Sequence, residues 1–233
     1  MTLRELQRDA VDTIKRHALV MSLRSPRAQA YILTEYLWTE ETTEAVSLEH
    51  AVAGDAPTWL GKLITAQLSD EHRHAALLRT RLADLRTAPR PPPKLSRAKL
   101  WWLERATAPY AGAFAAGPVV VLLAAAAQFE ATGVRILSRH LDVLEARERA
   151  SNAADPTADV VRSILSDEQR HAKSCAAAAL RLVRADERAA FEALQTRVAT
   201  IDRAFGITLA VRYWVLVAAL AAADRVRMRR EAV

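Results

Sequence analysis

The sequence is poor in cysteine, glycine and aromatic residues. It contains one cysteine, Cys175, and six glycines in 233 residues, and aromatic side chains make up 6%. A single cysteine excludes an intrachain disulfide and a zinc module built on several cysteines. The scarcity of glycine, with an apolar content rich in Ala, Leu and Val, argues against a sandwich or a doubly wound sheet and favours helices. Because apolar residues make up 51% of the chain, it can bury a core and is not a disordered chain.

The charge pattern narrows the location and the partners. The first ten residues carry charged side chains among the apolar ones, unlike a secretory signal, so we expect a cytoplasmic location. The net charge is +6, but acidic residues are interleaved throughout and no basic–aromatic platform appears, so we expect no nucleic-acid partner. Proline or Arg212 interrupts the apolar segments 106–129 and 206–223, so we expect both to dock on the protein; a membrane contact of the second stays open.

Prolines mark the expected helix starts. Four prolines each begin a long proline-free stretch, and a Ser or Asp suited to helix capping precedes three of them. They predict four long helices, at about 26–52, 57–86, 118–147 and 156–183. A long crossover at 88–117 joins two helix pairs, and further helices at about 2–22 and 186–229, the latter with a bend near Gly206, flank them. The pattern predicts an all-α fold, a four-helix bundle built as one domain over residues 1–233.

An internal repeat carries the chemistry. Residues 68–74 read Leu-Ser-Asp-Glu-His-Arg-His and residues 165–171 read Leu-Ser-Asp-Glu-Gln-Arg-His, so six of seven positions match. Each contains Glu-x-x-His, and residues at i and i+3 leave a helix from one face. The two pairs, Glu71 with His74 and Glu168 with His171, share that face with apolar residues. A buried carboxylate must be compensated, which predicts a metal ion beside these pairs.

The other two bundle helices should each add a carboxylate. Glu130 is the one choice near the centre of helix 118–147, whereas helix 26–52 offers several. Aligning Glu40-x9-His50 with Glu130-x9-His140 favours Glu40 over Glu35 and Glu41, with Glu44 in reserve. All four glutamates lie 12 or 14 residues after the proline that begins their helix, about 18–21 Å along it, so antiparallel helices bring them to one level.

The complete pattern resembles the ferritin-like di-iron carboxylate superfamily over about residues 26–183. It reads Glu40-x29-Asp70-Glu71-x2-His74, then Glu130-x36-Asp167-Glu168-x2-His171. The Asp-Glu-x-Arg-His strings look most like the oxygenases of that group. Ile164 stands where arylamine N-oxygenases show an extra histidine, and no four-cysteine rubredoxin site is present. The subfamily therefore stays open.

The resemblance implies a ligand set and its surroundings. The implied metal ligands are Glu40, Glu71, His74, Glu130, Glu168 and His171, with Glu71 and Glu168 bridging two ions. The implied cofactor is two iron ions, with a manganese–iron pair or two manganese ions as alternatives. Asp70 would accept the N–H of His171, and Asp167 that of His74. Tyr36, one turn before Glu40, is a further candidate for hydrogen bonding near the metals, although a packing role is favoured.

Three functions are compatible with such a bundle. The favoured one is a dioxygen-activating di-iron oxidase or oxygenase that acts on a small organic substrate. No dinucleotide or flavin fingerprint is present, so a separate electron donor or the substrate itself must supply electrons. The alternatives are a ferroxidase or other iron-handling protein, and a helical interaction module without catalysis. A homodimer stays open.

Overall fold

The structure, a computed structural model, describes residues 2–42, 57–88 and 94–231. Every regular element in these ranges is helical, and seven of the elements are α-helices. They are α1 (Leu3–Ser22), α2 (Pro26–Thr42), α4 (Thr58–Asp84), α5 (Lys94–Thr107), α6 (Val119–Ser151), α7 (Pro156–Leu182) and α8 (Arg188–Glu231). The short 3-10 turns η1 (Ala108–Tyr110) and η2 (Ala185–Glu187) precede α6 and α8. The expected all-α class is confirmed.

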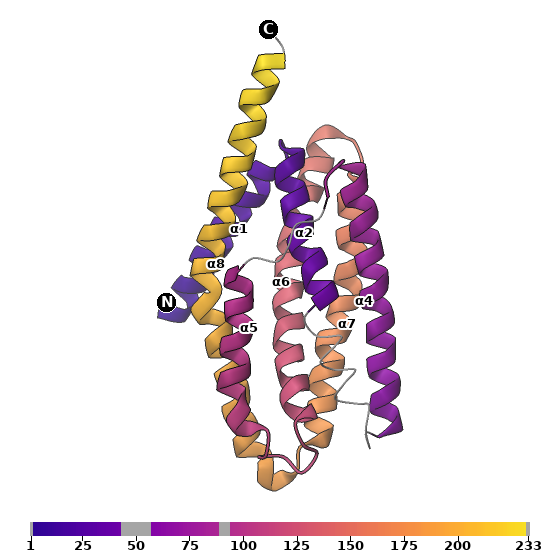
Figure 1. Cartoon of the computed structure of the whole chain (residues 1–233), viewed down its shortest axis with the longest axis vertical. Coiled ribbons are helices and arrows are strands. Elements are labelled where there is room, and N and C mark those ends of the chain that lie inside the picture. The colour runs from indigo at the N-terminus through magenta and orange to yellow at the C-terminus, as the bar shows by residue number, and fades with distance from the viewer. Residues whose placement is uncertain (1, 43–56, 89–93, 232–233) are drawn as a thin grey trace.

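The helices pack as pairs. α2 packs on α4, α6 packs on α7, and α4 also contacts α7. α8 runs beside α1 and α5, and its C-terminal turns project past the other helices (Figure 1). The site therefore lies among α2, α4, α6 and α7, while α1, α5 and α8 stand against one side of them.

Side-chain caps explain two of the helix starts. The Ser25 hydroxyl accepts the Ala28 N–H at 3.1 Å, and an Asp155 oxygen accepts the Thr157 N–H at 2.9 Å. Proline follows each cap as the first helical residue, where its missing N–H costs no hydrogen bond. α4 and α6 begin one residue after their prolines. The expected continuation of the first bundle helix to residue 52 lies outside the described residues.

The structure adds detail to two flanking segments. The crossover contains α5, because the stretch from Lys94 to Thr107 is free of proline and can continue a helix between two proline-containing turns. The C-terminal segment is one continuous helix, α8, which runs through Gly206. Glycine is tolerated there because the helix packs along α1, where a Cβ on Gly206 would lie 3.8 Å from Val11.

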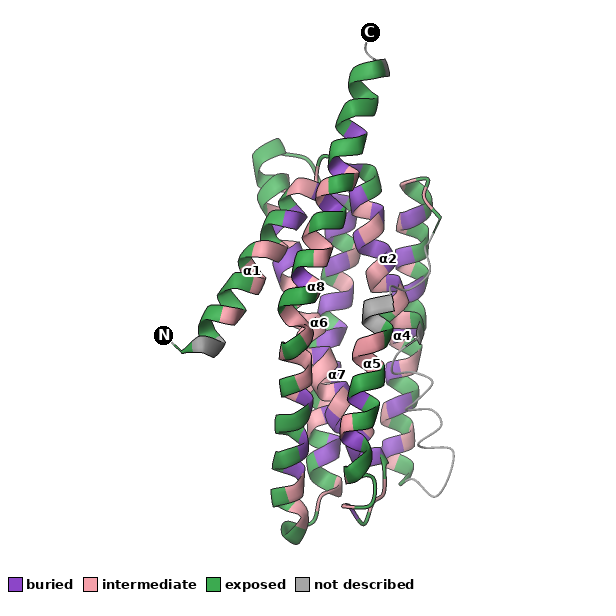
Figure 2. Cartoon of the chain, turned by 60° about the vertical axis from the view of Figure 1, so that its left-hand side comes forward, coloured by how far each residue is buried: buried purple, intermediate pink, exposed green. Residues whose placement is uncertain are grey.

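Apolar clusters lie on both sides of the central polar residues, on the helix faces that are buried in Figure 2. One cluster includes Leu60 and Ile64 of α4 and Leu123 of α6, which precede the central glutamates of their helices. The other cluster includes Leu78 and Leu137, which follow them. The glutamates therefore lie in a water-poor layer between two hydrophobic clusters.

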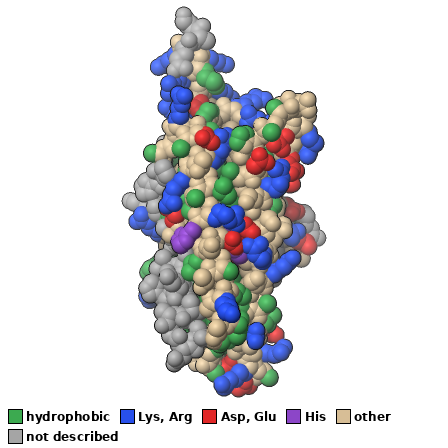
Figure 3. Space-filling view, turned by 90° about the vertical axis from the view of Figure 1, so that its right-hand side faces the viewer, with side chains coloured by type: hydrophobic (Ala, Val, Ile, Leu, Met, Phe, Trp, Pro, Cys, Tyr) green, Lys and Arg blue, Asp and Glu red, His purple; other side chains and the backbone are tan. Residues whose placement is uncertain are grey.

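The surface and the longest helices bear on membrane contact. Basic and acidic side chains are interspersed over the described part of the face in Figure 3. Two segments, Val119–Ser151 and Ala185–Arg230, are long and apolar enough to cross a membrane. In the first, 44% of the apolar window is buried inside the protein, and in the second, which contains α8, 17% is buried. Ile207, Val211 and Val215 contribute to the exposed apolar side of α8.

Candidate metal centre

Six acidic and histidine side chains meet among α2, α4, α6 and α7, at the middle of α4 and α7 and in the last turn of the described part of α2. Glu40, Glu71, His74 and Glu168 offer ligand atoms within 4.8 Å of one another. Glu71, Glu130 and His171 form a second such group, and Glu71 belongs to both. No side chain of the six is more than 10% exposed. The structure thus brings together the six residues that the sequence pattern singles out, in two groups that could hold metal ions.

His74 faces three of the carboxylates through one ring nitrogen. Its Nδ1 lies 3.1 Å from Oε2 of Glu40. The same atom lies 3.7 Å from Oε2 of Glu71 and 3.7 Å from Oε1 of Glu168. Carboxylate oxygens from three helices therefore surround one imidazole nitrogen.

His171 repeats this arrangement in the second group. Its Nδ1 lies 3.3 Å from Oε1 of Glu71, 3.8 Å from Oε1 of Glu168 and 3.9 Å from Oε1 of Glu130. This buried nitrogen makes no hydrogen bond with any described residue. A buried polar atom without a partner is costly, and a lone pair pointing at three carboxylates is the arrangement that a cation satisfies.

The opposite nitrogen of each histidine contacts an aspartate from the other repeat. Nε2 of His74 lies 3.2 Å from Oδ2 of Asp167, and Nε2 of His171 lies 3.1 Å from Oδ2 of Asp70. A carboxylate that accepts the Nε2 proton fixes the tautomer with a lone pair on Nδ1. Each aspartate can therefore orient a histidine on the neighbouring helix, with its free nitrogen turned to the cluster.

Two arginines tie these aspartates together. Arg73 pairs with Asp70 at 3.0 Å and with Asp167, and Arg170 pairs with Asp70 at 2.6 Å and with Asp167 at 2.7 Å. Burial raises the pKa of both aspartates, but the hydrogen bonds from Arg73 and from the histidines outweigh it and hold both below their usual range. The two aspartates are therefore anionic and remain hydrogen-bond acceptors for the imidazoles.

The central carboxylates are electrostatically strained. Burial, followed by contact with Glu71, raises the pKa of Glu40, and burial next to Glu130 raises the pKa of Glu168 to about 10. For Glu71 the contact with Glu40 and the proximity of the two histidines outweigh burial, so its pKa is lowered. Four carboxylates crowded into an apolar interior require positive partners, either protons or metal cations.

Neighbouring candidates are engaged elsewhere. Glu35 pairs with Arg212 at 3.4 Å, and Glu41 pairs with Arg79 at 2.6 Å, so only Glu40 of these three reaches the cluster. The reserve candidate Glu44, and also His50, lie outside the described residues.

Tyr36 hydrogen-bonds a histidine rather than one of the six clustered residues. Its hydroxyl lies 3.1 Å from Nδ1 of His140. His140 is buried, and burial lowers its pKa to about 4. The ring is therefore neutral at pH 7 and links α6 to α2 through Tyr36.

Sequence reasoning missed two residues that lie beside the carboxylates, Gln67 and Gly133. Nε2 of Gln67 donates to Oε1 of Glu130 at 2.6 Å, and Sγ of Cys175 donates to Oε1 of Gln67 at 3.3 Å. The sequence signal for Gln67 was its position: it is a polar residue one turn before Glu71 on an otherwise apolar helix face. Gly133 is the other, since a Cβ there would lie 3.0 Å from Oε2 of Glu168.

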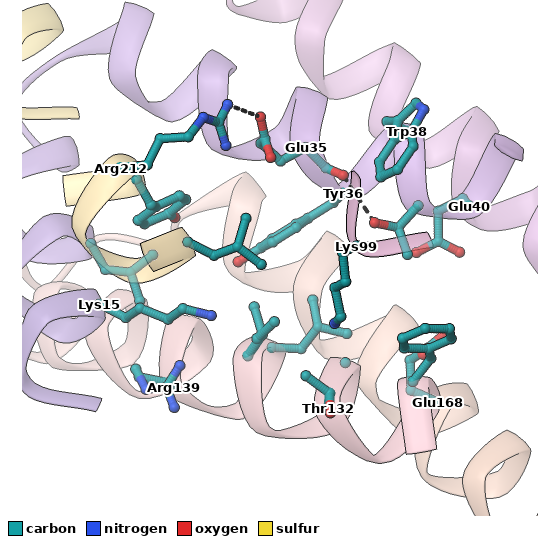
Figure 4. Close-up of a pocket in the computed structure, with 18 of the residues that line it drawn as sticks. Lys15, Glu35, Tyr36, Trp38, Glu40, Lys99, Thr132, Arg139, Glu168 and Arg212 are labelled. Carbon is teal, nitrogen blue, oxygen red and sulfur yellow. Dashed lines mark hydrogen bonds and ion pairs between the residues drawn. The ribbon is translucent and has the colours of Figure 1, made fainter. Parts of the chain in front are cut away.

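A cavity of about 230 Å³ adjoins the cluster. Glu40 and Glu168 form part of its wall, and residues of α1, α2, α5, α6 and α8 form the rest (Figure 4). Apolar side chains, including Phe129, Ile136 and Leu209, share the wall with charged ones. The absence of a side chain at Gly133 leaves space beside the Glu168 carboxylate.

Comparison with known proteins adds no family. No family model matches the sequence, and no curated protein gives a significant match. The chain is thus described by its own structure: an all-helical protein with buried Glu and His groups that could hold metal ions.

Proposed function

We propose that this chain is a ferritin-like dinuclear metalloprotein, with iron as the metal, that activates dioxygen to oxidise a small organic substrate. The observation that carries the proposal is the convergence of four glutamates and two histidines in a buried layer, with an unbonded Nδ1 on His171. Bundles of this class take one glutamate from each of two helices and a Glu-x-x-His pair from each of the other two.

The donor set fits two divalent ions. Four carboxylates balance the charge of two divalent cations, and the two histidines can add a neutral imidazole to each. Carboxylate oxygen together with imidazole nitrogen suits iron and manganese better than soft-metal chemistry. Glu40 and His74 would belong to one ion and Glu130 and His171 to the other, with Glu71 and Glu168 shared between them.

The protein residues would prepare the site for oxidation. Bound iron would supply the redox chemistry that dioxygen requires. Asp70 and Asp167 hold the imidazoles in the ligating tautomer, and the flanking apolar layers exclude water. In a monooxygenation, one oxygen atom enters the substrate and the other leaves as water, with two protons and two electrons from a separate donor.

Elemental analysis with optical spectra tests the proposal. Iron-loaded protein should hold two irons per chain and change its spectrum when the reduced form meets air. Glu71→Ala and Glu168→Ala should each lose most of the metal, because both glutamates face both ions. Glu192→Ala, an exposed glutamate on α8, is the matched control and should keep both. Two ions per chain in both cluster variants would contradict the site assignment.

Iron storage makes a different prediction. The cavity against Glu40 and Glu168 favours an enzyme, because an iron store needs no chamber for an organic molecule beside its centre. The oxidation of added ferrous iron should therefore saturate near two irons per chain. A large assembly that accumulates many irons per chain would overturn the enzyme assignment and leave the ligand set intact.

A further inference from the structure

One end of the cavity carries a lysine without a partner. Lys15 of α1 is half-buried in the cavity wall, and no hydrogen bond or ion pair joins it to another residue within the described ranges. Burial, and then the nearby Arg139, lower its pKa to about 8, so the ammonium form still predominates at pH 7. A cation held in this position is stabilised by an anion that the chain itself does not provide.

The nearby acids are already engaged. Asp12 and Asp202 are the acids whose charges act on Lys15. Asp12 pairs with Arg139, and Asp202 pairs with Lys99 at 2.5 Å. Neither aspartate forms an ion pair with Lys15, so the positive charge of Lys15 is not neutralised locally.

The cavity has two chemically different ends. Figure 4 shows Lys15 and Arg139 together at one end, and Glu40 and Glu168 at the other. Ile136 and Leu137, which also line the cavity, stand in α6 between Gly133, which faces Glu168, and Arg139. A cavity of roughly 150 Å³ accommodates benzene, so a volume of about 230 Å³ suits one ring with a short substituent.

From this arrangement we infer that the cavity binds a small organic carboxylate, with its anionic group at Lys15 and its apolar body extending to Glu40 and Glu168. The inference rests on the proposed function, since it names the substrate class of that centre. The carboxylate would be fixed at the cationic end by a charge-assisted hydrogen bond from the Lys15 ammonium. The carbon atoms farthest from that group would then lie next to the metal ligands.

Binding measurements with matched acids and amides test the inference. Calorimetric titrations would use benzoate, phenylacetate and octanoate, each against its uncharged amide. They would be run under argon on the full chain loaded with iron and again after the metal is removed. At least one acid should bind about tenfold or more tightly than its amide in both forms, because the anion meets Lys15 rather than the metal.

Variants locate the anion. Lys15→Met should weaken binding of that acid about 10- to 100-fold and leave the amide unchanged, whereas Lys15→Arg should restore most of the affinity. The control is Lys62→Met, which alters an exposed lysine of α4 and should bind like wild type. Ile136→Trp, which fills the apolar middle, should weaken acid and amide alike.

Three outcomes would overturn the inference. They are no binding of any acid, equal affinity for acids and amides, or acid binding that needs iron and is unaffected by Lys15→Met. Failure of the proposed function would appear separately, as absence of metal in elemental analysis while the acid preference persists.

Discussion

Replacing Asp167 by Asn tests whether each aspartate acts on the histidine of the other repeat. Asp167 contacts Nε2 of His74 at 3.2 Å, so it should control the proposed metal ion at His74 rather than the one at His171, the histidine of its own helix. Asn has the same size but carries no charge, so the imidazole loses a charge-assisted hydrogen bond while packing is kept. We expect the ion at His74 to bind more weakly and the ion at His171 to be unchanged.

The magnitude follows from the environment of the aspartate. Loss of an outer carboxylate partner of a ligating histidine costs about 10- to 100-fold in metal affinity, or about 1.4–2.7 kcal/mol. The fold should tolerate the change, because the arginines that pair with Asp167 have side chains 44% and 55% exposed. Ion pairs at such exposure contribute less than about 1 kcal/mol each.

Competition with a chromophoric ferrous chelator under argon measures both affinities. Asp167→Asn should raise one of the two dissociation constants. The double variant with His74→Ala should lose little more metal affinity than His74→Ala alone, because both changes affect the same ion. Combination with His171→Ala should weaken both ions. Asp159→Asn, on the same helix with a side chain 71% exposed, is the control. Equal weakening of both ions by Asp167→Asn alone would refute the crossed arrangement.

Two further predictions concern α2 and α6. Glu40→Gln should lower metal content or dioxygen reactivity at least tenfold more than Glu41→Gln or Glu35→Gln, since Glu40 alone of the three reaches His74; equal effects in metal analysis would count against Glu40. His140→Gln should remove a pH dependence of stability. Unfolded His140 takes up a proton below pH about 6.5, whereas the folded residue stays neutral to about 4. Stability is therefore present above pH 6.5 and is lost as pH falls, by roughly 2 kcal/mol between pH 7.5 and 5. In urea unfolding, the difference in free energy of unfolding between wild type and His140→Gln should become smaller at acid pH. A difference that stays constant with pH would contradict this prediction.

The helical framework was predictable because its signals are local. Proline together with a capping Ser25 or Asp155 marks a helix start within the chain itself, without tertiary information. The α5 helix was missed because the crossover is rich in proline at both ends, and the proline-free stretch between them was read as part of the link. The proline content of the whole crossover thus drew attention away from the proline-free stretch that forms α5.

The meeting of the six cluster residues was predictable from register. Glu40 and Glu71 each lie 14 residues after the proline that begins their expected helix, and the midpoints of antiparallel helices meet at one level, so the spacing placed the two glutamates together. Gln67 was within reach of the same argument, because it lies on the face that points at Glu130. That these residues bind metal remains a prediction, since spacing establishes proximity and not occupancy.

The cavity was not predictable, because no motif joins its residues. Lys15, Lys99 and Arg212 come from three helices that are far apart in sequence, and nothing in their neighbours distinguishes them from surface charges. Only the packing of α1, α5 and α8 on one side of the bundle places them around one space. The sequence also does not tell which basic side chain lacks an acidic partner. Coordinates are needed to see that Asp12 pairs with Arg139 and Asp202 with Lys99.

The two sides of the cluster differ although the repeat is symmetric. On the side of α4 and α7, Asp70 and Asp167 are linked by arginines, which closes the cluster with charge-assisted bonds. On the other side, the cavity wall includes Glu40 and Glu168 but no residue of α4. Among the described residues, the space past α2 and α6, bounded by α1, α5 and α8, is therefore the route that we propose for an organic molecule. In the proposed function, the repeat would supply two metal sites, and the helices outside it would supply the selection of a substrate that a symmetric bundle alone would not make.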